Sequence, residues 1–477
     1  MKHLALALAL SVALPALAQA QTLDQRIAAK LAEAPQGTRF GLVVVDPDGK
    51  EIVAINPDGR FIPASNTKIY TTAAAFANLP DINQPDTTGG ATVALEGKDV
   101  VLIGRGDARM SSADDCTVDC LATLADAIAA KTKNVRDVIG SDVTFPDERW
   151  SPGMSWNNIP TSSGTGISAL TLDDNELKLV VTPGNAGAAP ATTLWPYFTI
   201  ENHAQTVPGD ETHLVWSRAP NGRVLRLAGT IGANAKPRNY SLGIDDPADY
   251  AAWRLRALLE ARGVKVKGQV RTRHRQISPE DDQGRSTETM TDDLGDVPVL
   301  AQITPPPVAE DLKHINKVSQ NLHAELTLRR VSLQAGDGSI KGGVAKVEAM
   351  LAAAGVPRTA WDFSDGSGMS SYNRVAPRAT VGLLRWITAQ SWGAQFRETL
   401  PIGGVDGTLA KRFKGTPLEG KVFAKTGTLN QTNAVAGYFT AASGKTLTFA
   451  FYANDVPGDA GATKYMDDVL NMVAAAN

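Results

Sequence analysis

The sequence predicts a mixed α/β (α+β) protein that is divided into several domains. Its 477 residues exceed what one hydrophobic core can organise, and this length is typical of about two to four domains. Segments with helical periodicity and segments with the two-residue alternation of strands follow one another through the first and last thirds. Between residues 177 and 238 only short alternating segments occur, separated by Gly, Pro and Asn turns, which predicts a small all-β module.

The N-terminal part of the chain begins with a helix, a hairpin and a second helix. We expect the first helix over 24–34 and the hairpin strands over 40–46 and 51–56. The second helix starts near Ser65, because Ile69, Ala73 and Phe76 have helical spacing. Further on we expect strands over 91–95, 100–103 and 138–143, a helix over 121–131 and a loop over 152–166.

The last third of the chain is rich in helical segments and closes with strands. A helix over 247–262, a strand over 264–271 and an exposed charged loop over 278–296 precede it. We expect helices over 308–317, 323–334, 342–354 and 378–389, strands over 422–425, 434–440 and 445–452, and a final helix from residue 462. If the first and last thirds form one domain, the middle is an insertion, which periodicity alone leaves open.

The charge balance and the N-terminus bear on partners and location. A formal net charge of −3, with no long run of Lys or Arg, gives no footprint for nucleic acid. Residues 1–20 have the parts of a secretory signal, namely a basic start, an apolar stretch and the small-residue site Ala18-Gln19-Ala20. A membrane anchor is the weaker alternative, because the apolar stretch is short and Pro15 interrupts it. We therefore expect export, cleavage after Ala20 and no transmembrane anchor.

The two cysteines of the chain, Cys116 and Cys120, lie four residues apart. In an oxidising compartment such a pair favours one disulfide that closes a small loop, with free thiols as the alternative. A metal site would need further ligands, and no histidine lies nearby. We expect neither a metal nor a cofactor.

Ser65 and Lys68 form a Ser-x-x-Lys pattern at the predicted start of a helix. Residues three apart share a helical face, so the lysine amine can lie beside the serine hydroxyl. A serine becomes a good nucleophile when a neighbouring base takes its proton, and a lysine can do this when burial or another cation lowers its pKa. None of the six histidines stands in a recognisable triad setting. The alternative is an N-cap serine followed by a solvated lysine.

A second motif, Lys425-Thr426-Gly427-Thr428, lies on a predicted strand. Alternation puts Lys425 and Gly427 on one face, where the missing side chain of the glycine lets another element approach closely. Such a strand can hold a substrate carboxylate through the lysine and a threonine, and can offer a backbone N–H to a developing oxyanion. The alternative is an edge strand with a solvated lysine.

A third motif, Ser319-Gln320-Asn321, stands immediately before the helix expected from His323. Because residues two apart do not share a helical face, Ser319 and Asn321 need a loop to act together. The Ser-x-Asn pattern occurs twice more, at Ser155 and at Ser371. Order along the chain and context favour Ser319, and the alternative is a helix cap.

The ordered set of these three motifs resembles that of the penicillin-recognising serine enzymes. The chain is similar in particular to the class C low-molecular-mass penicillin-binding proteins, the D-alanyl-D-alanine carboxypeptidase/endopeptidases. This similarity is carried by the segments 156–175, 314–321, 365–374, 404–409 and 424–429. It covers nearly the whole mature chain and is weakest over 183–238.

The resemblance implies a penicillin-recognising serine-enzyme fold, in which helices flank a five-stranded antiparallel sheet. The catalytic domain would comprise residues 21–80 and 298–477. Two domains would be inserted between the Ser65 helix and the Ser319 loop. One is an α/β domain over 81–176 and 239–297, and the other is the small all-β domain over 177–238.

The resemblance also implies a role for each motif residue. Ser65 would be the nucleophile, Lys68 its base, and Ser319 a relay of the proton to the leaving D-alanine, while Asn321 orients Lys68 and the substrate amide. The substrate-binding strand would supply Lys425, Thr426 and Thr428 for the terminal carboxylate, and the N–H groups of Ser65 and Thr428 as the oxyanion hole. Gln320 stands where many relatives have another residue, at a position that varies. From the residues alone, we expect Lys68 and Lys425 each to lower the pKa of the other.

These expectations describe a periplasmic serine peptidase that acts on peptidoglycan stem peptides and cross-links and is acylated by β-lactam antibiotics. A β-lactamase shares the motifs, but no equivalent of its deacylating glutamate is recognisable and the chain is far longer than such an enzyme needs. A non-catalytic cell-wall binding protein and an esterase are the remaining alternatives. The sequence leaves open whether the protein forms a homodimer.

Overall fold

The computed structural model describes residues 21–277, 298–334, 336–458 and 460–477. The expected signal over 1–20 and the expected loop over 278–296 lie outside these residues. No helix within the described ranges is long and apolar enough to cross a membrane. The helices in these ranges are α1 (Leu23–Ala32), α2 (Thr67–Asn78), α3 (Leu121–Lys131), α4 (Pro247–Ala261), α5 (Val308–Val318), α6 (Asn321–Ser332), α7 (Ile340–Ala353), α8 (Pro377–Thr388), α9 (Gly393–Thr399) and α10 (Thr463–Ala476).

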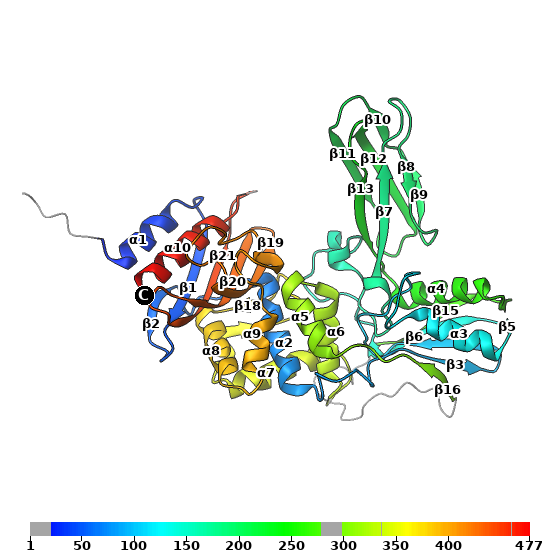
Figure 1. Ribbon diagram of the computed structural model, residues 1–477, viewed down its shortest axis with the longest axis horizontal. Helices are drawn as coiled ribbons and strands as arrows, with labels where there is room; N and C mark the ends of the chain where they lie inside the picture. The colour runs from blue at the N-terminus through cyan, green and yellow to red at the C-terminus, as the bar shows by residue number, and fades with distance from the viewer. Residues whose placement is uncertain (1–20, 278–297, 335, 459) are drawn as a thin grey trace, which may run out of the picture.

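The two ends of the chain build one antiparallel sheet in the order β19-β20-β21-β1-β2 (Figure 1). Its strands are β1 (Arg39–Val45), β2 (Glu51–Ile55), β19 (Val422–Leu429), β20 (Thr432–Thr440) and β21 (Thr446–Asn454). The hairpin expected over 40–46 and 51–56 is confirmed, and its first strand pairs with β21, with Leu42 opposite Phe451. The first and last thirds of the chain therefore share one sheet.

Helices cover both faces of this sheet. On one face α1 and α10 contribute Ile27 and Met466 to the same apolar core as Phe451. On the other face α2 and α8 pack with Tyr452, the next residue of β21. Successive side chains of a strand point to opposite faces, so neighbouring residues of β21 serve the two cores. Burial on both faces makes the sheet a firm support for β19, which carries Lys425.

A second five-stranded sheet has the order β15-β6-β4-β3-β16 and lies beside α3 and α4. Its strands are β3 (Thr92–Glu96), β4 (Asp99–Ile103), β6 (Val138–Pro146), β15 (Val270–Arg275) and β16 (Val299–Gln302). Strand β6 is parallel to both of its neighbours, whereas β3 pairs antiparallel with β4 and β16. Because β16 belongs to this sheet, the boundary expected between 297 and 298 falls just before one of its strands.

The strand expected over 264–271 is wrong in one respect, because two separate strands replace it. Strand β14 (Lys265–Val266) pairs with β5 (Asn134–Val135), and β15 then pairs with β6. The chain bends between them, where the Gly268 N–H donates to the Arg136 carbonyl at 2.7 Å and the Gln269 N–H donates to Asp137 at 2.8 Å. A side chain at Gly268 would overlap the Asp137 carboxylate, so the absence of a side chain permits the bend.

The all-β part projects from the rest of the molecule (Figure 1). It contains β7 (Glu176–Thr182), β8 (Ala191–Thr193), β9 (Thr199–Asn202), β10 (Gln205–Val207), β11 (Thr212–Ser217), β12 (Val224–Gly232) and β13 (Arg238–Gly243). These strands form a three-stranded sheet, β13-β7-β8, and a four-stranded sheet in which β12 pairs with β9, β10 and β11. Strand β13 pairs with β7 along its length, so strand pairing continues to Gly243, beyond the expected boundary at 238.

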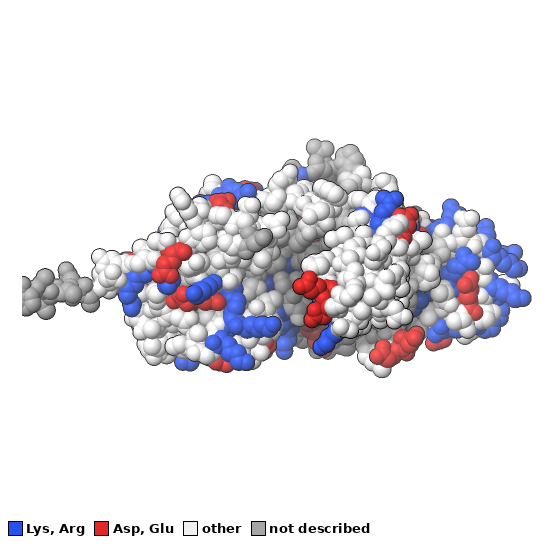
Figure 2. Space-filling view, turned by 90° about the horizontal axis from the view of Figure 1, so that it is seen from above, with Lys and Arg blue, Asp and Glu red and all other residues white. Residues whose placement is uncertain are grey.

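The charged side chains are unevenly distributed over the surface. Figure 2 shows Lys and Arg side chains gathered at the end of the molecule that holds β5 and β14. Exposed basic residues at this end are Lys98, Lys131, Lys133, Arg136, Lys265 and Lys267. They come from segments far apart in the sequence, which explains why no basic run marks them.

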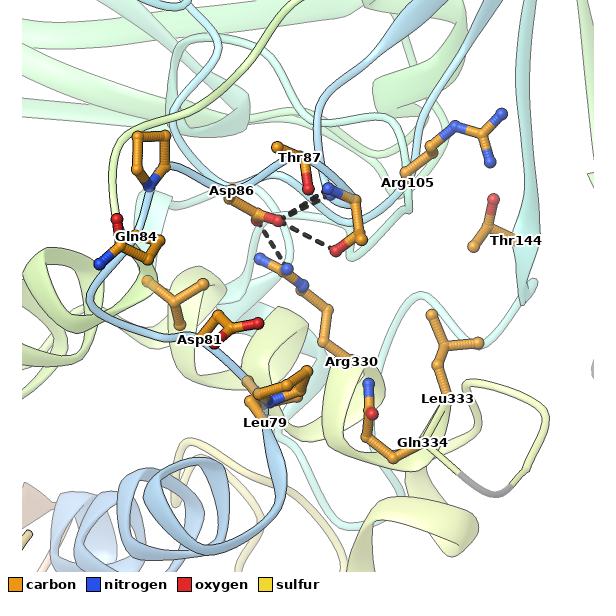
Figure 3. Close-up of a pocket in the computed structure, with 15 residues that line it drawn as sticks. Leu79, Asp81, Gln84, Asp86, Thr87, Arg105, Thr144, Arg330, Leu333 and Gln334 are labelled. Atoms are coloured by element: carbon orange, nitrogen blue, oxygen red, sulfur yellow. Dashed lines mark hydrogen bonds and ion pairs between the residues drawn. The ribbon is translucent and has the colours of Figure 1, made fainter.

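A cavity of about 580 Å³ lies where α2 and α6 end, next to the second sheet (Figure 3). Its lining includes Leu79 after α2, Leu333 after α6 and Thr144 of β6. Within it Arg330 pairs with the Asp86 carboxylate at 2.6 Å. The guanidinium lowers the pKa of Asp86 against the opposing effect of burial, so this ion pair ties α6 to the segment before β3.

Candidate active site

Ser65 lies in a single 3₁₀ turn, Ala64–Asn66, that leads into α2. The α-helix itself starts at Thr67, two residues later than the position expected for Ser65 at its N-terminus. Ala64 has a positive φ of 47°, and a side chain at Gly368 would overlap the Ala64 carbonyl. Close packing of the Gly368 backbone therefore holds the turn in a conformation that an alanine rarely adopts.

Lys68 is completely buried and reaches three oxygen atoms. Its Nζ lies 3.0 Å from Ser65 Oγ, 2.7 Å from Asn321 Oδ1 and 2.6 Å from the Ser367 carbonyl. The expected pairing of Ser65 with Lys68 is thus present in the structure. The two other contacts fix the amine, so that it cannot turn away from the hydroxyl.

Burial lowers the pKa of Lys68 to about 7, against the opposing influence of Asp365 and Glu325. The sequence-based expectation named Lys425 as a cause of this shift, and for Lys68 that is wrong, because desolvation is responsible. For Lys425 the expectation holds, since burial and then the charge of Lys68 bring its pKa well below the ordinary value. A lysine with a pKa near neutrality exists in part as the free amine that a base requires.

Ser319 and Asn321 stand at the corner between α5 and α6. Ser319 follows α5 in the left-handed conformation, with φ 64° and ψ 42°, and its Oγ accepts a hydrogen bond from Lys425 Nζ at 2.9 Å. Asn321 is the first residue of α6, which begins two residues earlier than expected. Its Nδ2 donates to the Ser163 carbonyl at 3.1 Å, while its Oδ1 accepts from Lys68. The loop expected for this motif is present at Ser319 and Gln320, whereas Asn321 already belongs to α6.

Lys425 lies on β19, fully buried, and its Nζ also donates to the Thr426 carbonyl at 2.9 Å. The Asn66 side chain donates to the Lys425 carbonyl at 2.9 Å, so β19 is tied to the turn that carries Ser65. Thr426 Oγ1 lies 2.6 Å from Thr408 Oγ1, and Thr428 is exposed. Hydrogen bonds thus link Ser65, Lys68 and Asn321 in one group and join Ser319 to Lys425 beside it.

The close approach expected at Gly427 is present. A Cβ on this glycine would lie 2.5 Å from the Pro63 carbonyl and 3.1 Å from the Asn66 amide nitrogen, both beside Ser65. The strand can therefore reach the serine turn only without a side chain here. An outward movement of β19 would carry the Thr428 N–H away from the turn that holds Ser65.

Replacing Gly427 with alanine is expected to lower the rate of acylation by about tenfold or more, because a displacement near 1 Å is costly in a positioned site. The rate of labelling by a fluorescent β-lactam measures this effect. Gly461→Ala is a useful control, since Gly461 has no positive φ and a Cβ there would meet only Thr463 Oγ1, at 4.0 Å. Equal labelling rates for Gly427→Ala and wild type would contradict the close packing described for this strand.

Residues that the sequence interpretation missed lie behind Lys68. Glu325 of α6 accepts hydrogen bonds from the backbone N–H groups of Gly366 and Ser367 at 3.0 and 2.9 Å, which places the Ser367 carbonyl against Lys68. Asp365 is buried nearby, and desolvation, followed by Glu325, raises its pKa to about 6. Its Oδ1 accepts from Asn373 at 2.6 Å. Asn373 belongs to the further Ser-x-Asn motif at Ser371, and this motif therefore helps to hold Asp365 behind Lys68.

Two further expectations from the sequence concern the cysteine pair and metal binding. Cys116 and Cys120 form the expected disulfide, just before α3. Within the described residues no group of three or more His, Cys, Asp or Glu side chains could hold a metal ion.

A buried amine beside a serine hydroxyl, with a second buried lysine and a strand close by, is an arrangement typical of serine hydrolases. Residues 23–476 match the model of the D-Ala-D-Ala carboxypeptidase 3 (S13) family. The chain belongs to this family, which confirms both the resemblance and the expected activity of a serine-type D-Ala-D-Ala carboxypeptidase.

Two relatives support this assignment, and one solved structure shows the same fold. The chain is 31% identical to a D-alanyl-D-alanine carboxypeptidase of Actinomadura sp. (strain R39), over 89% of this chain and 79% of the relative. It is 25% identical to D-alanyl-D-alanine carboxypeptidase DacB of Haemophilus influenzae, over 88% and 86% of the two chains. The crystal structure of penicillin binding protein 4 (dacB) from Haemophilus influenzae has the same fold, with a TM-score of 0.77 at 21% identity over 94% of this chain and 97% of that chain.

Proposed function

We propose that the protein is an exported D-Ala-D-Ala carboxypeptidase and endopeptidase that cleaves peptidoglycan stem peptides and cross-links through an acyl-enzyme on Ser65. The observation that carries this proposal is the buried Lys68 amine, 3.0 Å from Ser65 Oγ, with its pKa lowered to about 7. This arrangement gives a hydroxyl a base that is able to take its proton near neutral pH.

In the proposed acylation step, neutral Lys68 takes the proton of Ser65 as Oγ attacks the carbonyl carbon of the penultimate D-alanine. The N–H groups of Ser65 and Thr428 stabilise the oxyanion. When the tetrahedral intermediate collapses, the C–N bond breaks and Ser319 gives its proton to the leaving nitrogen, while the proton that Lys68 took from Ser65 replaces the one lost by Ser319. The leaving group is free D-alanine in the carboxypeptidase reaction and the amine of a second stem peptide in the endopeptidase reaction. Water then hydrolyses the ester at Ser65.

We assign recognition of the terminal carboxylate to Lys425, Thr426 and Thr428. Burial disfavours the charged form of Lys425, and a bound carboxylate would restore it through a charge-assisted hydrogen bond. A β-lactam carries a carboxylate next to its reactive amide, so the same groups would hold the antibiotic. A crystal structure of the Haemophilus influenzae penicillin binding protein 4 with a β-lactam supports this extension.

We also propose the division of the chain described above from the sequence, with two shifted boundaries. The catalytic domain would join residues 21–80 to the part after β16, and the all-β domain would include β13 up to Gly243. Export by residues 1–20 would place the enzyme in the periplasm, where its substrate is found.

Mass spectrometry of muropeptides tests the proposed reaction. Wild-type protein incubated with pentapeptide monomers should release D-alanine, and with cross-linked dimers it should release two monomers. Ser65→Ala should do neither. Loss of D-alanine without cleavage of dimers would reject the endopeptidase part alone, and unchanged muropeptides would reject both.

The lifetime of the acyl-enzyme formed with penicillin distinguishes a peptidase from the alternative, a β-lactamase. Of the carboxylates near Lys68, Glu325 already accepts hydrogen bonds from two backbone N–H groups and from Arg329 at 2.9 Å, so it is not free to activate water. We therefore expect a penicilloyl mass increase at Ser65 that persists for many minutes. Rapid turnover of penicillin would favour the lactamase.

The acylation rate is expected to depend on pH through Lys68. The base must be neutral, and its pKa lies at about 7. The rate constant should therefore fall by about tenfold for each pH unit below this value and level off above it. Stopped-flow acylation with a chromogenic β-lactam between pH 5 and 9 measures this profile. A rate that stays constant down to pH 5 would contradict a lysine base.

A further inference from the structure

Two hydrogen bonds orient the side chain of Asn321, and one of them comes from the part of the chain between α2 and β16, which we call the inserted part. Its Oδ1 accepts from Lys68 at 2.7 Å and its Nδ2 donates to the Ser163 carbonyl at 3.1 Å. An amide that donates on one side and accepts on the other is fixed against rotation by 180°. The position of the Ser163 carbonyl therefore decides whether Asn321 presents its oxygen to the base.

The segment around Ser163 is held by a tight turn at Asp173, Asp174 and Asn175. Asn175 is completely buried, donates to the Gly166 carbonyl at 3.0 Å and accepts from Thr165 Oγ1 at 2.6 Å through its own carbonyl. All three turn residues have positive φ, at 52°, 55° and 50°. Consecutive left-handed residues are costly, so such a turn persists only where its surroundings enforce it.

The same turn binds the catalytic helices. Asp174 Oδ1 lies 2.8 Å from Nε2 of His323, and Nδ1 of this histidine lies 2.6 Å from Asp311 Oδ1. His323 is two residues from Asn321 on α6, and Asp311 is on α5, which ends just before Ser319. The imidazole thus joins three segments at the corner that presents both side chains of the Ser-x-Asn motif.

Asp173 anchors the turn on its other side. Its carboxylate accepts from the Ser112 N–H at 2.7 Å, from Ser112 Oγ at 2.6 Å and from Tyr250 Oη at 3.2 Å. These partners lie in the loop before the disulfide and in α4. The turn is therefore a fixed point of the inserted part and does not follow the catalytic helices passively.

We propose that His323 and Asp174 are positioning residues for acylation, which hold the Ser163 carbonyl and α6 in register so that Asn321 keeps Lys68 beside Ser65. This inference deepens the proposed function and rests on it. It means that the inserted part of the chain completes the active site.

The electrostatic surroundings of His323 keep the pairing intact over the working range of pH. Asp311 and Asp174 raise the pKa of His323 from 6.5 to about 10, against burial. The imidazolium therefore stabilises the fold fully below pH 6.5, and this contribution is lost as pH rises through about 10. The other titratable groups that line the pocket beside it are His314, Lys313, Lys317 and Glu310 of α5 and Arg109 of the inserted part, and burial and the charge of His323 lower the pKa of His314.

The test separates the rate constant of acylation from noncovalent binding of a chromogenic β-lactam to the full-length mature protein. His323→Gln and Asp174→Ala are each expected to lower the rate constant by about 10- to 100-fold, with a smaller change in noncovalent affinity. The double variant should be no slower than the slower single variant, because both substitutions break the same contact, that between His323 and Asp174. Asp174→Asn keeps an acceptor oxygen and should recover part of the rate.

The pH profile gives a second readout that a merely structural role would not move. With one carboxylate uncharged in Asp174→Asn, the pKa of His323 falls, so the acylation rate should decline at a lower alkaline pH than in wild type. His213→Gln is the matched control, since His213 lies 3.5 Å from Glu211 in a pair whose side chains are 74% and 85% exposed. Its acylation rate should equal that of wild type.

Two results would overturn the proposal. One is a set of folded variants that are labelled at the wild-type rate, even if their melting temperature is lower. The other is rates that multiply in the double variant, since independent effects would show that the two residues do not act through one contact. If His323→Gln does not fold, Asp174→Ala decides the question alone, because the side chain of Asp174 is 46% exposed. A wild-type protein without label would reject the acyl-enzyme, and with it this proposal.

Discussion

Replacing Lys68 with alanine is expected to slow acylation of Ser65 by about three orders of magnitude, within the range that a positioned general base contributes. The reason is that Lys68 Nζ is the group that lies 3.0 Å from Ser65 Oγ, and burial has brought its pKa close to neutrality. The substitution also leaves Asn321 Oδ1 and the Ser367 carbonyl without their shared donor. The measurement is the rate of penicilloyl-enzyme formation, followed by mass.

Two controls make this result specific. Lys445→Ala removes an exposed lysine in the turn between β20 and β21 and should leave the rate unchanged. Lys68→Arg retains a cation but cannot act as a base near neutral pH, so it should be about as slow as the alanine variant. An arginine variant with wild-type activity would show that Lys68 serves only as a charge.

Replacing Lys425 with alanine is expected to lower kcat/KM for peptides ending in D-Ala-D-Ala by about 100-fold, the upper range for one charge-assisted hydrogen bond. Lys425 is fully buried and contacts Ser319 Oγ at 2.9 Å, so its loss removes both the cation for the substrate carboxylate and the donor to Ser319. Steady-state release of D-alanine provides the measurement.

A substrate with an amidated C-terminus separates these two losses. If Lys425 acts through the carboxylate, wild type should already be slow with the amide, and the Lys425→Ala substitution should add little further loss. If the variant is slowed equally with both substrates, Lys425 would act through Ser319 and not through recognition of the carboxylate.

Local sequence signals predicted several elements of the fold closely. The helix expected over 121–131 is α3, with the same bounds, and the strand expected over 434–440 lies within β20. The start of α6 was placed two residues late, because the side chain of Gln320 caps the helix by accepting from the Leu322 N–H. Glutamine is not among the usual capping residues, so the sequence gives no sign of this start.

Tertiary packing explains the elements that the sequence did not predict. Helix α9 has seven residues, begins at a glycine and has no capping side chain. It is held by Phe396, which packs against Phe76 of α2 with ring centroids 6.0 Å apart. The pairing of β1 with β21 is equally invisible in the sequence, since both strands are buried along nearly their whole length and their residue types do not say which strand lies beside which.

In the candidate site, too, the sequence predicts some residues, whereas others follow only from tertiary packing. Three motifs named Ser65, Lys68, Ser319, Asn321 and Lys425, and the structure joins them by hydrogen bonds in two adjacent groups. The groups that hold them in place had no signal. A backbone carbonyl such as that of Ser163 leaves no mark in the residue types, and a buried carboxylate such as Glu325 looks in the sequence like any helix surface residue.

The position of β1 between β21 and β2 has a consequence for how the protein is made. Chains are synthesised from the N-terminus, so the β1–β2 hairpin is made long before β21. Until β21 is synthesised, the edge of β1 that pairs with it stays unpaired. The all-β part can fold earlier, because its strands pair with one another within residues 176–243. The sheet that carries the candidate site should therefore form last and slowly. A chain that stops before β21 would leave the edge of β1 unpaired, and we expect such a chain to aggregate instead of folding into a smaller enzyme.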